Sequence, residues 1–191
     1  MDATGEAVVR AELQPDEVLL WWGQPNPNRI FTTSDWLLVP FSLMWAGFAV
    51  FWEATVIIGA TRAGSGFLFF VFWGLIFVGL GLYFVAGRFF VKRISKLRTY
   101  YAVSDRRVFV ISTAFRHNVK SASIKRLPGL ELSAGRDGSG NIAFGPSSGL
   151  TGIYANTGMD FFLWGRGVRP LAFYDLDDAR KVYELVDRLA A

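Results

Sequence analysis

Two long stretches of the chain carry almost no charge and show no polar face. The first, 36–60, contains a single acidic residue, Glu53, and the second, 67–87, has no charged residue at any of its 21 positions. A helix needs roughly 20 apolar residues to cross a hydrocarbon core about 30 Å thick, and aromatic residues gather near the ends of both stretches, as at membrane interfaces. This pattern predicts transmembrane helices at 36–60 and 67–87, joined by a short external loop at 61–66.

Composition favours a membrane hairpin over its alternative, a pair of buried helices in a soluble domain. Hydrophobic residues make up 52% of the 191 positions and charged residues only 19%, against about 25% charged in an average soluble domain. A domain of this size rarely supplies enough protein to bury two such helices on all sides. The aromatic content of 16% also excludes a disordered chain.

After the second stretch, the pattern changes to short runs of β-forming residues separated by turns. These runs predict strands at 99–103, 107–112, 119–124, 129–133, 141–144 and 169–174, with a short strand at 152–154 inside a Gly-rich loop, 146–158. Asp175 precedes apolar residues at helical spacing and predicts an N-cap before a final helix over 176–189. The predicted fold of 99–191 is therefore α+β: an antiparallel barrel or sandwich capped by a C-terminal α-helix.

Charges flank the two stretches unequally, and this asymmetry predicts the orientation. The N-terminal segment, 1–35, has a net charge of −4 and lacks the basic start of a signal peptide. Five basic residues follow the second stretch, in the predicted juxtamembrane linker 88–98: Arg88, Lys92, Arg93, Lys96 and Arg98. The external loop has only Arg62, so we expect a multi-pass protein of the cell (inner or plasma) membrane with both termini cytoplasmic. A second interpretation adds attraction of the basic cluster to anionic lipid.

Short motifs along most of the chain carry a resemblance to a known family. They are LQPDEVLLWWGQP at 13–25, YYAVSDRRV at 100–108, GSGNIAFG at 138–145, and Phe173 leading into the final helix. Together with the hairpin, they resemble bacterial membrane proteins that have a pleckstrin-homology-like (PH-like) domain. The resemblance implies such a domain at 99–191, with 100–103 in its first strand.

The resemblance also suggests candidate ligand contacts. In eukaryotic relatives of the fold, basic residues around the first hairpin turn bind phosphoinositides, and the resemblance places Arg106 and Arg107 at that turn. Arg116 and Lys120 lie beside the same strands and complete a candidate set for contacts with a lipid headgroup or a protein partner.

Motifs for catalysis and for metal binding do not meet the requirements of their chemistry. The sequence GPSSG at 145–149 fits a nucleophile elbow, but the single histidine, His117, precedes the serine instead of following it. There is no cysteine and no Gly-Lys-Ser/Thr loop, and a helix N-terminus explains Asp175, Asp177 and Asp178. We expect no enzyme activity, cofactor or metal site. The net charge of +4 comes without a nucleic-acid recognition motif, so we expect no nucleic acid either.

Glu53 is the unusual charge of the first span. An acid at the centre of a span costs about 2.5–3.5 kcal/mol and by default indicates a functional site. Alternatively, the first span is shorter and ends at Trp52, which places Glu53 close to the outer headgroups.

The sequence as a whole predicts a non-enzymatic membrane protein. Its cytoplasmic PH-like domain is expected to bind a protein partner or a second copy of the chain. The alternative is a module that senses anionic lipid headgroups through the basic turn. Transport is a third function, but it would need more polar groups in the spans than Glu53.

Overall fold

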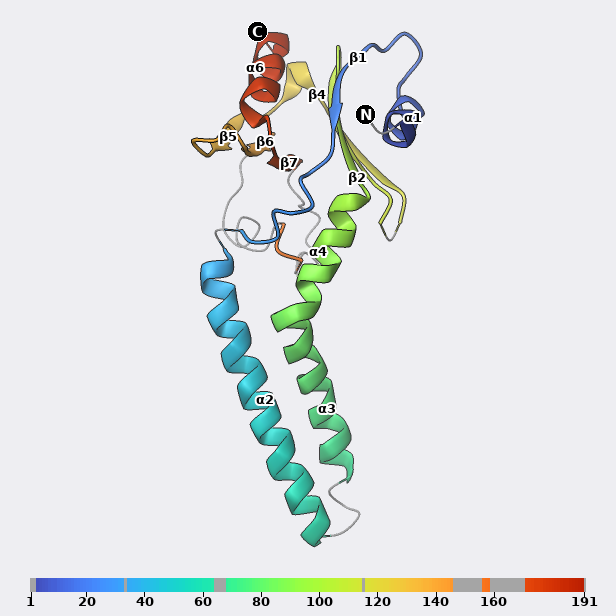
Figure 1. The fold of residues 1–191 in the computed structure, drawn as a ribbon. Coiled ribbons are helices and arrows are strands. Elements are labelled where there is room, and N and C mark those ends of the chain that lie inside the picture. Colours follow the sequence, from blue (N-terminus) through green and yellow to red (C-terminus); the bar gives the residue numbers. More distant parts are fainter. Residues whose placement is uncertain are drawn as a thin grey trace.

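Two long helices form a hairpin at one end of the molecule (Figure 1). The computed structural model describes residues 3–32, 34–63, 68–114, 116–145, 156–158 and 171–190. Helix α2 covers Asp35–Ala63, and α3 (Leu68–Leu82) continues through a π-helical turn, η2 (Tyr83–Gly87), into α4 (Arg88–Leu97). Both arms are long and apolar enough to cross a membrane, in agreement with the two predicted stretches. The loop predicted at 61–66 begins later, since α2 reaches Ala63, and the predicted linker is helical as far as Leu97.

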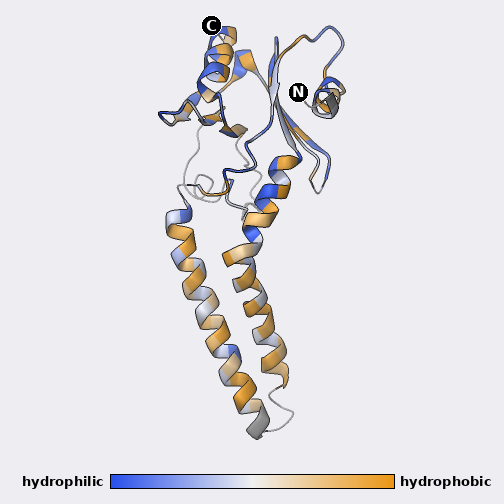
Figure 2. Cartoon of the chain, in the orientation of Figure 1, coloured by the Kyte–Doolittle hydropathy of each residue, from blue (hydrophilic) through white to orange (hydrophobic). Residues whose placement is uncertain are grey.

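The hairpin packs through small residues and turns its large apolar side chains outward. A Cβ atom on Gly81 would lie 3.0 Å from the Cα atom of Ala46, so glycine permits a close approach of the two helices. On the outside, Trp36, Phe51 and Phe72 are exposed, and Figure 2 shows apolar residues along the full length of both arms. An apolar exterior over two such helices is the surface that lipid covers in membrane proteins.

A four-stranded antiparallel sheet takes one strand from before the hairpin and three strands from after it. Strands β2 (Thr99–Ser104), β3 (Arg107–Ser112) and β4 (Asn118–Ser123) lie at predicted positions, and a 3₁₀ turn, η3 (Ile124–Arg126), follows them. Strand β1 (Leu19–Gly23) pairs with β2, and the strand order is β1-β2-β3-β4. This strand was not predicted, since 1–35 was expected to be a separate N-terminal segment. The hairpin is therefore inserted between the first two strands of the sheet.

A second, three-stranded sheet and the C-terminal helix complete the fold. The sheet contains β5 (Glu131–Ala134), β6 (Gly140–Ala143) and β7 (Ala172–Leu176), all antiparallel, and α6 covers Ala179–Ala190. The described strands form two separate sheets, so the closed barrel that the sequence analysis allowed is not observed. The strand predicted at 152–154 and most of the loop around it lie outside the described residues.

Hydrophobic side chains are buried on both faces of the four-stranded sheet. On one face, Tyr101 and Phe173 stack with ring centroids 4.6 Å apart in a core that the second sheet and α6 cover. On the other face, Val9 of helix α1 (Ala3–Arg10) packs against Phe109 and Ile111. Figure 1 shows α1 and α6 on opposite sides of the sheet. A fragment that began at Arg98 would lose β1 and α1, and this second core would be uncovered.

Candidate functional site at the junction of hairpin and sheets

Helix α4 turns three of its four charged side chains toward the protein interior. Arg88, Lys92 and Lys96 are spaced four residues apart, so they lie on one face of the helix. All three are buried, and Arg88 is 0% exposed. Charged residues of a helix at a protein surface normally face solvent. This arrangement therefore needs acceptors on elements that pack against α4, among them the segment 24–35 and strand β7.

The first buried cation, Arg88, pairs with the residue that begins the hairpin. Its Nη1 atom lies 2.6 Å from Oδ1 of Asp35, and its guanidinium stacks 4.4 Å from the ring centroid of Phe89. The other carboxylate oxygen of Asp35 accepts hydrogen bonds from the backbone N–H and the hydroxyl of Thr32. Asp35 thus joins the start of α2 to the start of α4, at the level where the two arms of the hairpin meet the sheets.

The other two buried cations bind the chain segment that leads into α2. Lys92 donates to the backbone carbonyl of Ile30, with Nζ and O 2.7 Å apart. Lys96 donates to the carbonyls of Asn26 and Arg29 and forms an ion pair of 2.7 Å with Asp175 of β7. Three cations and two carboxylates therefore connect α4, the segment before α2, and the last strand. We call this set, Arg88, Lys92, Lys96, Asp35 and Asp175, the charged junction.

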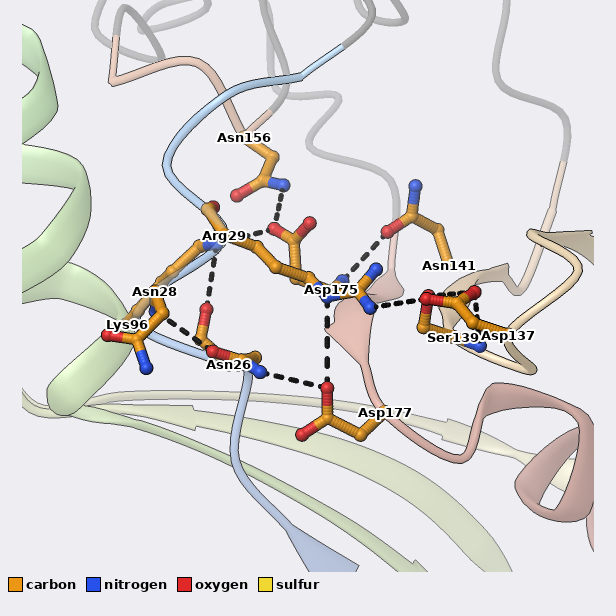
Figure 3. Close-up of polar contacts among 10 residues, drawn as sticks. All are labelled: Asn26, Asn28, Arg29, Lys96, Asp137, Ser139, Asn141, Asn156, Asp175 and Asp177. Carbon is orange, nitrogen blue, oxygen red and sulfur yellow. Dashed lines mark hydrogen bonds and ion pairs between the residues drawn. The ribbon is translucent and has the colours of Figure 1, made fainter.

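Asp175 reaches the junction because the backbone of β7 bends there. Its φ of 53° is left-handed, a conformation that Asp and Asn tolerate better than most residues. Its carboxylate also accepts from the side-chain amide of Asn156, and its backbone N–H donates to the side-chain oxygen of Asn141 (Figure 3). The prediction that Asp175 caps the final helix is wrong, since β7 runs to Leu176 and α6 begins at Ala179.

A second ion pair ties the same segment to the three-stranded sheet. Arg29 lies 2.9 Å from Asp137, in the turn between β5 and β6 (Figure 3). Hydrogen bonds from Ser139 and from Arg29 lower the pKa of Asp137 to about 2. The segment before the hairpin thus contacts the three-stranded sheet at two places, the β5–β6 turn and β7, although the sequence gives it no apolar pattern.

The turn predicted to bind lipid headgroups is held by the N-terminal segment instead. The Arg107 guanidinium donates to both carboxylate oxygens of Glu17, at 2.8 and 2.9 Å, and the Ser104 hydroxyl donates to the first of them. Burial alone would raise the pKa of Glu17, but these hydrogen bonds and that of the Gln14 N–H lower it to about 2. The charge of Arg107 is therefore compensated inside the protein.

The four residues predicted as lipid or partner contacts do not lie together. Arg106 lies in the turn between β2 and β3 and Arg107 begins β3, while Arg116 and Lys120 lie before and within β4. The β3–β4 register pairs Arg107 with Ser123, so the length of a strand, about 15–20 Å, separates that turn from Arg116. Because β1 precedes the hairpin, this turn joins the second and third strands of the sheet.

The five basic residues predicted beside the membrane fall into two groups, three that are buried and two that are exposed. Arg88, Lys92 and Lys96 are buried in the charged junction, whereas Arg93 and Arg98 are exposed. The acidic partners of the buried group, Asp35 for Arg88 and Asp175 for Lys96, were not predicted from the sequence as ion-pair partners. The four-residue spacing of the three buried cations was the signal in the sequence that could have indicated a common face.

Glu53 lies inside the hairpin rather than at its end. The side chain is 5% exposed, and neither carboxylate oxygen has a hydrogen-bond partner among the described residues. α2 continues for ten residues past Glu53 to Ala63, about 15 Å. The helix therefore continues past Trp52, and where the membrane ends along it stays a prediction. Gly74 of α3 faces Glu53, and a Cβ atom there would overlap Oε2 of the carboxylate.

Replacing Gly74 with alanine is expected to destabilise the hairpin by about 1–3 kcal/mol, because the added methyl group overlaps the Glu53 carboxylate. Gly79 of the same helix has open space around it, so Gly79→Ala is the matched control and should be nearly neutral. Unfolding in detergent micelles would measure both. In a Glu53→Ala background the cost of Gly74→Ala should largely disappear; an unchanged cost would show that Glu53 does not occupy this space.

The comparisons with known proteins give no relative for this site. No family model matches the chain, and neither the curated proteins nor the solved structures include a match. Across the described ranges, no group of three or more His, Asp or Glu side chains is arranged to hold a metal ion. The predictions of no cofactor and no enzyme activity therefore stay predictions, and the charged junction is the site that the geometry defines best.

Proposed function

We propose that the protein is a membrane-anchored interaction module: a divergent PH-like domain built around its own transmembrane hairpin. Antiparallel sheets followed by a C-terminal helix occur in the order that the sequence resemblance implies, which supports this domain type. The excess of Lys and Arg after α3 supports a cytoplasmic domain with both termini on that side. The two ends of the described chain also lie opposite the hairpin turn (Figure 1).

The charged junction is the observation that carries the proposal. An interaction domain on a flexible linker samples many positions relative to its anchor. Here α4 ends at Leu97 and β2 begins at Thr99, and buried ion pairs hold α4 to the segment before α2 and to β7. The sheets thus keep one height and one orientation above the membrane, which suits a platform that positions a protein partner or a second copy.

Sensing of a lipid headgroup by the basic turn has less support. Glu17 engages Arg107, and Asp105 lies 3.6 Å from Arg106. Little uncompensated positive charge is left at the β2–β3 turn, so we place the partner-binding function first.

Photocrosslinking in intact cells tests the platform. A photoreactive residue would replace Arg116, Ser121, Glu131 or Lys181, which are exposed on different elements away from the junction. We expect discrete protein adducts from the positions on one surface, and the same adduct from the purified chain if the partner is a second copy. The proposal fails if no position gives more protein adduct than Ile76, an exposed residue of α3.

A junction variant serves as the matched control for this experiment. Lys96→Met removes the ion pair with Asp175 but keeps an unbranched side chain of similar length. If a fixed orientation matters, the variant should lower the adduct yield while the protein remains in the membrane. An unchanged adduct yield would show that partner binding does not depend on the charged junction.

A further inference from the structure

The outer face of α4 is apolar, although its inner face is charged. The exposed positions of this helix and the residue after it are Phe90, Arg93, Ile94, Leu97 and Arg98. Phe90 is 69% exposed, and Ile94 and Leu97 are about half exposed. The spacing of these positions places them on one stripe, opposite Arg88, Lys92 and Lys96. A surface helix of a soluble protein buries its apolar face and exposes its charged face, and α4 has the opposite arrangement.

A further exposed aromatic side chain lies beside α4, next to a residue between its inner and outer faces. Phe31, in the segment before α2, is 73% exposed, and its ring centroid lies 5.2 Å from that of Phe89. We call Phe31, Phe90, Ile94 and Leu97, together with Arg93 and Arg98, the outer stripe. Large exposed aromatic and aliphatic side chains grouped in this way indicate a surface that something covers.

The position of the stripe along the hairpin indicates what covers it. α3, η2 and α4 form one helical arm from Leu68 to Leu97, 30 residues long, or about 45 Å. A hydrocarbon core is about 30 Å thick, and a whole bilayer with its headgroups is about 40–45 Å thick. A core that begins near Leu68 therefore ends near Arg88, and the first turns of α4 lie level with the headgroup layer. The stripe continues the lipid-facing surface of α3.

The charges of the stripe favour lipid over a second copy of the chain. Copies in one membrane share an orientation, so pairing through this stripe would bring Arg93 and Arg98 close to the same residues of the other copy. Phospholipid phosphates are complementary to both arginines, and their long side chains can reach from an apolar surface to a phosphate.

We infer that the outer stripe is a lipid-contact surface that sinks the base of the sheet domain into the headgroup layer, with a preference for anionic phospholipid. This inference rests on the membrane insertion of the hairpin proposed above. It separates the basic residues beside the membrane into two roles: the inner three hold the protein together, and Arg93 and Arg98 contact lipid phosphates.

Spin labels test the position of the stripe directly, because the chain has no cysteine of its own. Single cysteines would replace Ile94 in the stripe, Ile76 in α3 and Lys181 in α6 of the full chain, reconstituted in vesicles of equal phosphatidylcholine and phosphatidylglycerol. Accessibility to oxygen and to a water-soluble nickel chelate would then be measured. We expect residue 76 to show high oxygen and low nickel accessibility and residue 181 to show the opposite. Residue 94 should lie between them, as a position near the headgroups does, and be well separated from residue 181.

The other outcomes distinguish failure of this inference from failure of membrane insertion. If residue 94 resembles residue 181 while residue 76 lies in lipid, the inference is overturned and the membrane hairpin stands. If residue 76 is also in water, membrane insertion itself is wrong. Spin–spin broadening at residue 94 would overturn the inference in favour of a second copy.

The preference for anionic lipid is tested with a fluorophore on residue 94 and brominated phospholipids as quenchers. We expect brominated phosphatidylglycerol to quench more than brominated phosphatidylcholine, and Arg93→Gln with Arg98→Gln to reduce this preference by roughly fivefold for each arginine at low salt. Lys125→Gln with Arg126→Gln removes two exposed basic residues outside the stripe. Equal quenching by the two lipids in the unmodified chain, or the same loss in this control, would overturn the preference.

Discussion

Replacing Asp35 with asparagine is expected to lower the free energy of unfolding by about 3–5 kcal/mol, because it leaves the buried Arg88 without its counter-charge. Asparagine keeps a side-chain oxygen that can accept the hydrogen bonds of Thr32, so the change removes the charge while these hydrogen bonds can persist. Arg88 is fully buried and has no route to solvent in this arrangement. Unfolding in micelles, followed by circular dichroism, would measure the loss.

A double variant distinguishes loss of the ion pair from general damage to the junction. Asp35→Asn combined with Arg88→Met removes both charges and fills the site with an apolar side chain, a replacement that is often neutral or stabilising for buried pairs. We expect it to recover most of the stability lost in Asp35→Asn. If the double variant is no more stable than Asp35→Asn, the pairing of these two charges is not what holds the junction.

Acidification is expected to destabilise the protein through Glu17. The pKa of this carboxyl is about 2 in the folded chain and 4.5 as its ordinary value, so the unfolded chain binds a proton at the higher pH. The carboxylate therefore contributes its full stabilisation above about pH 4.5 and loses it as pH falls toward 2, a contribution of about 3 kcal/mol. Unfolding of the full chain in micelles at pH 7 and near pH 3 would measure it.

Two variants separate this contribution from that of other carboxylates. Glu17→Gln should be less stable than the unmodified chain at pH 7, and the difference between them should shrink on acidification. Glu184→Gln, at an exposed position of α6, is the control and should follow the unmodified chain at both pH values. A constant difference between Glu17→Gln and the unmodified chain across this range would exclude Glu17 as the group that titrates.

The sequence by itself determined the two long helices, most strands of the sheets and the final helix. These elements have local signals: uninterrupted apolar residues over 67–87, β-forming runs such as 107–112, and helical spacing of apolar positions after Asp178. Such patterns involve residues close together in the chain, and the predicted elements are observed with small shifts in their bounds.

Long-range pairing was decided only in the tertiary structure. Leu19–Gly23 becomes a strand because it pairs with β2 across the inserted hairpin, which no local pattern indicates. The basic residues after α3 look alike in the sequence, yet their direction depends on which acceptors pack against each face of α4. Arg88 and Lys96 are buried because Asp35 and Asp175, 53 and 79 residues away in the chain, compensate their charge. Arg93 and Arg98 remain outside because the other face of the helix has no such partner in the described chain.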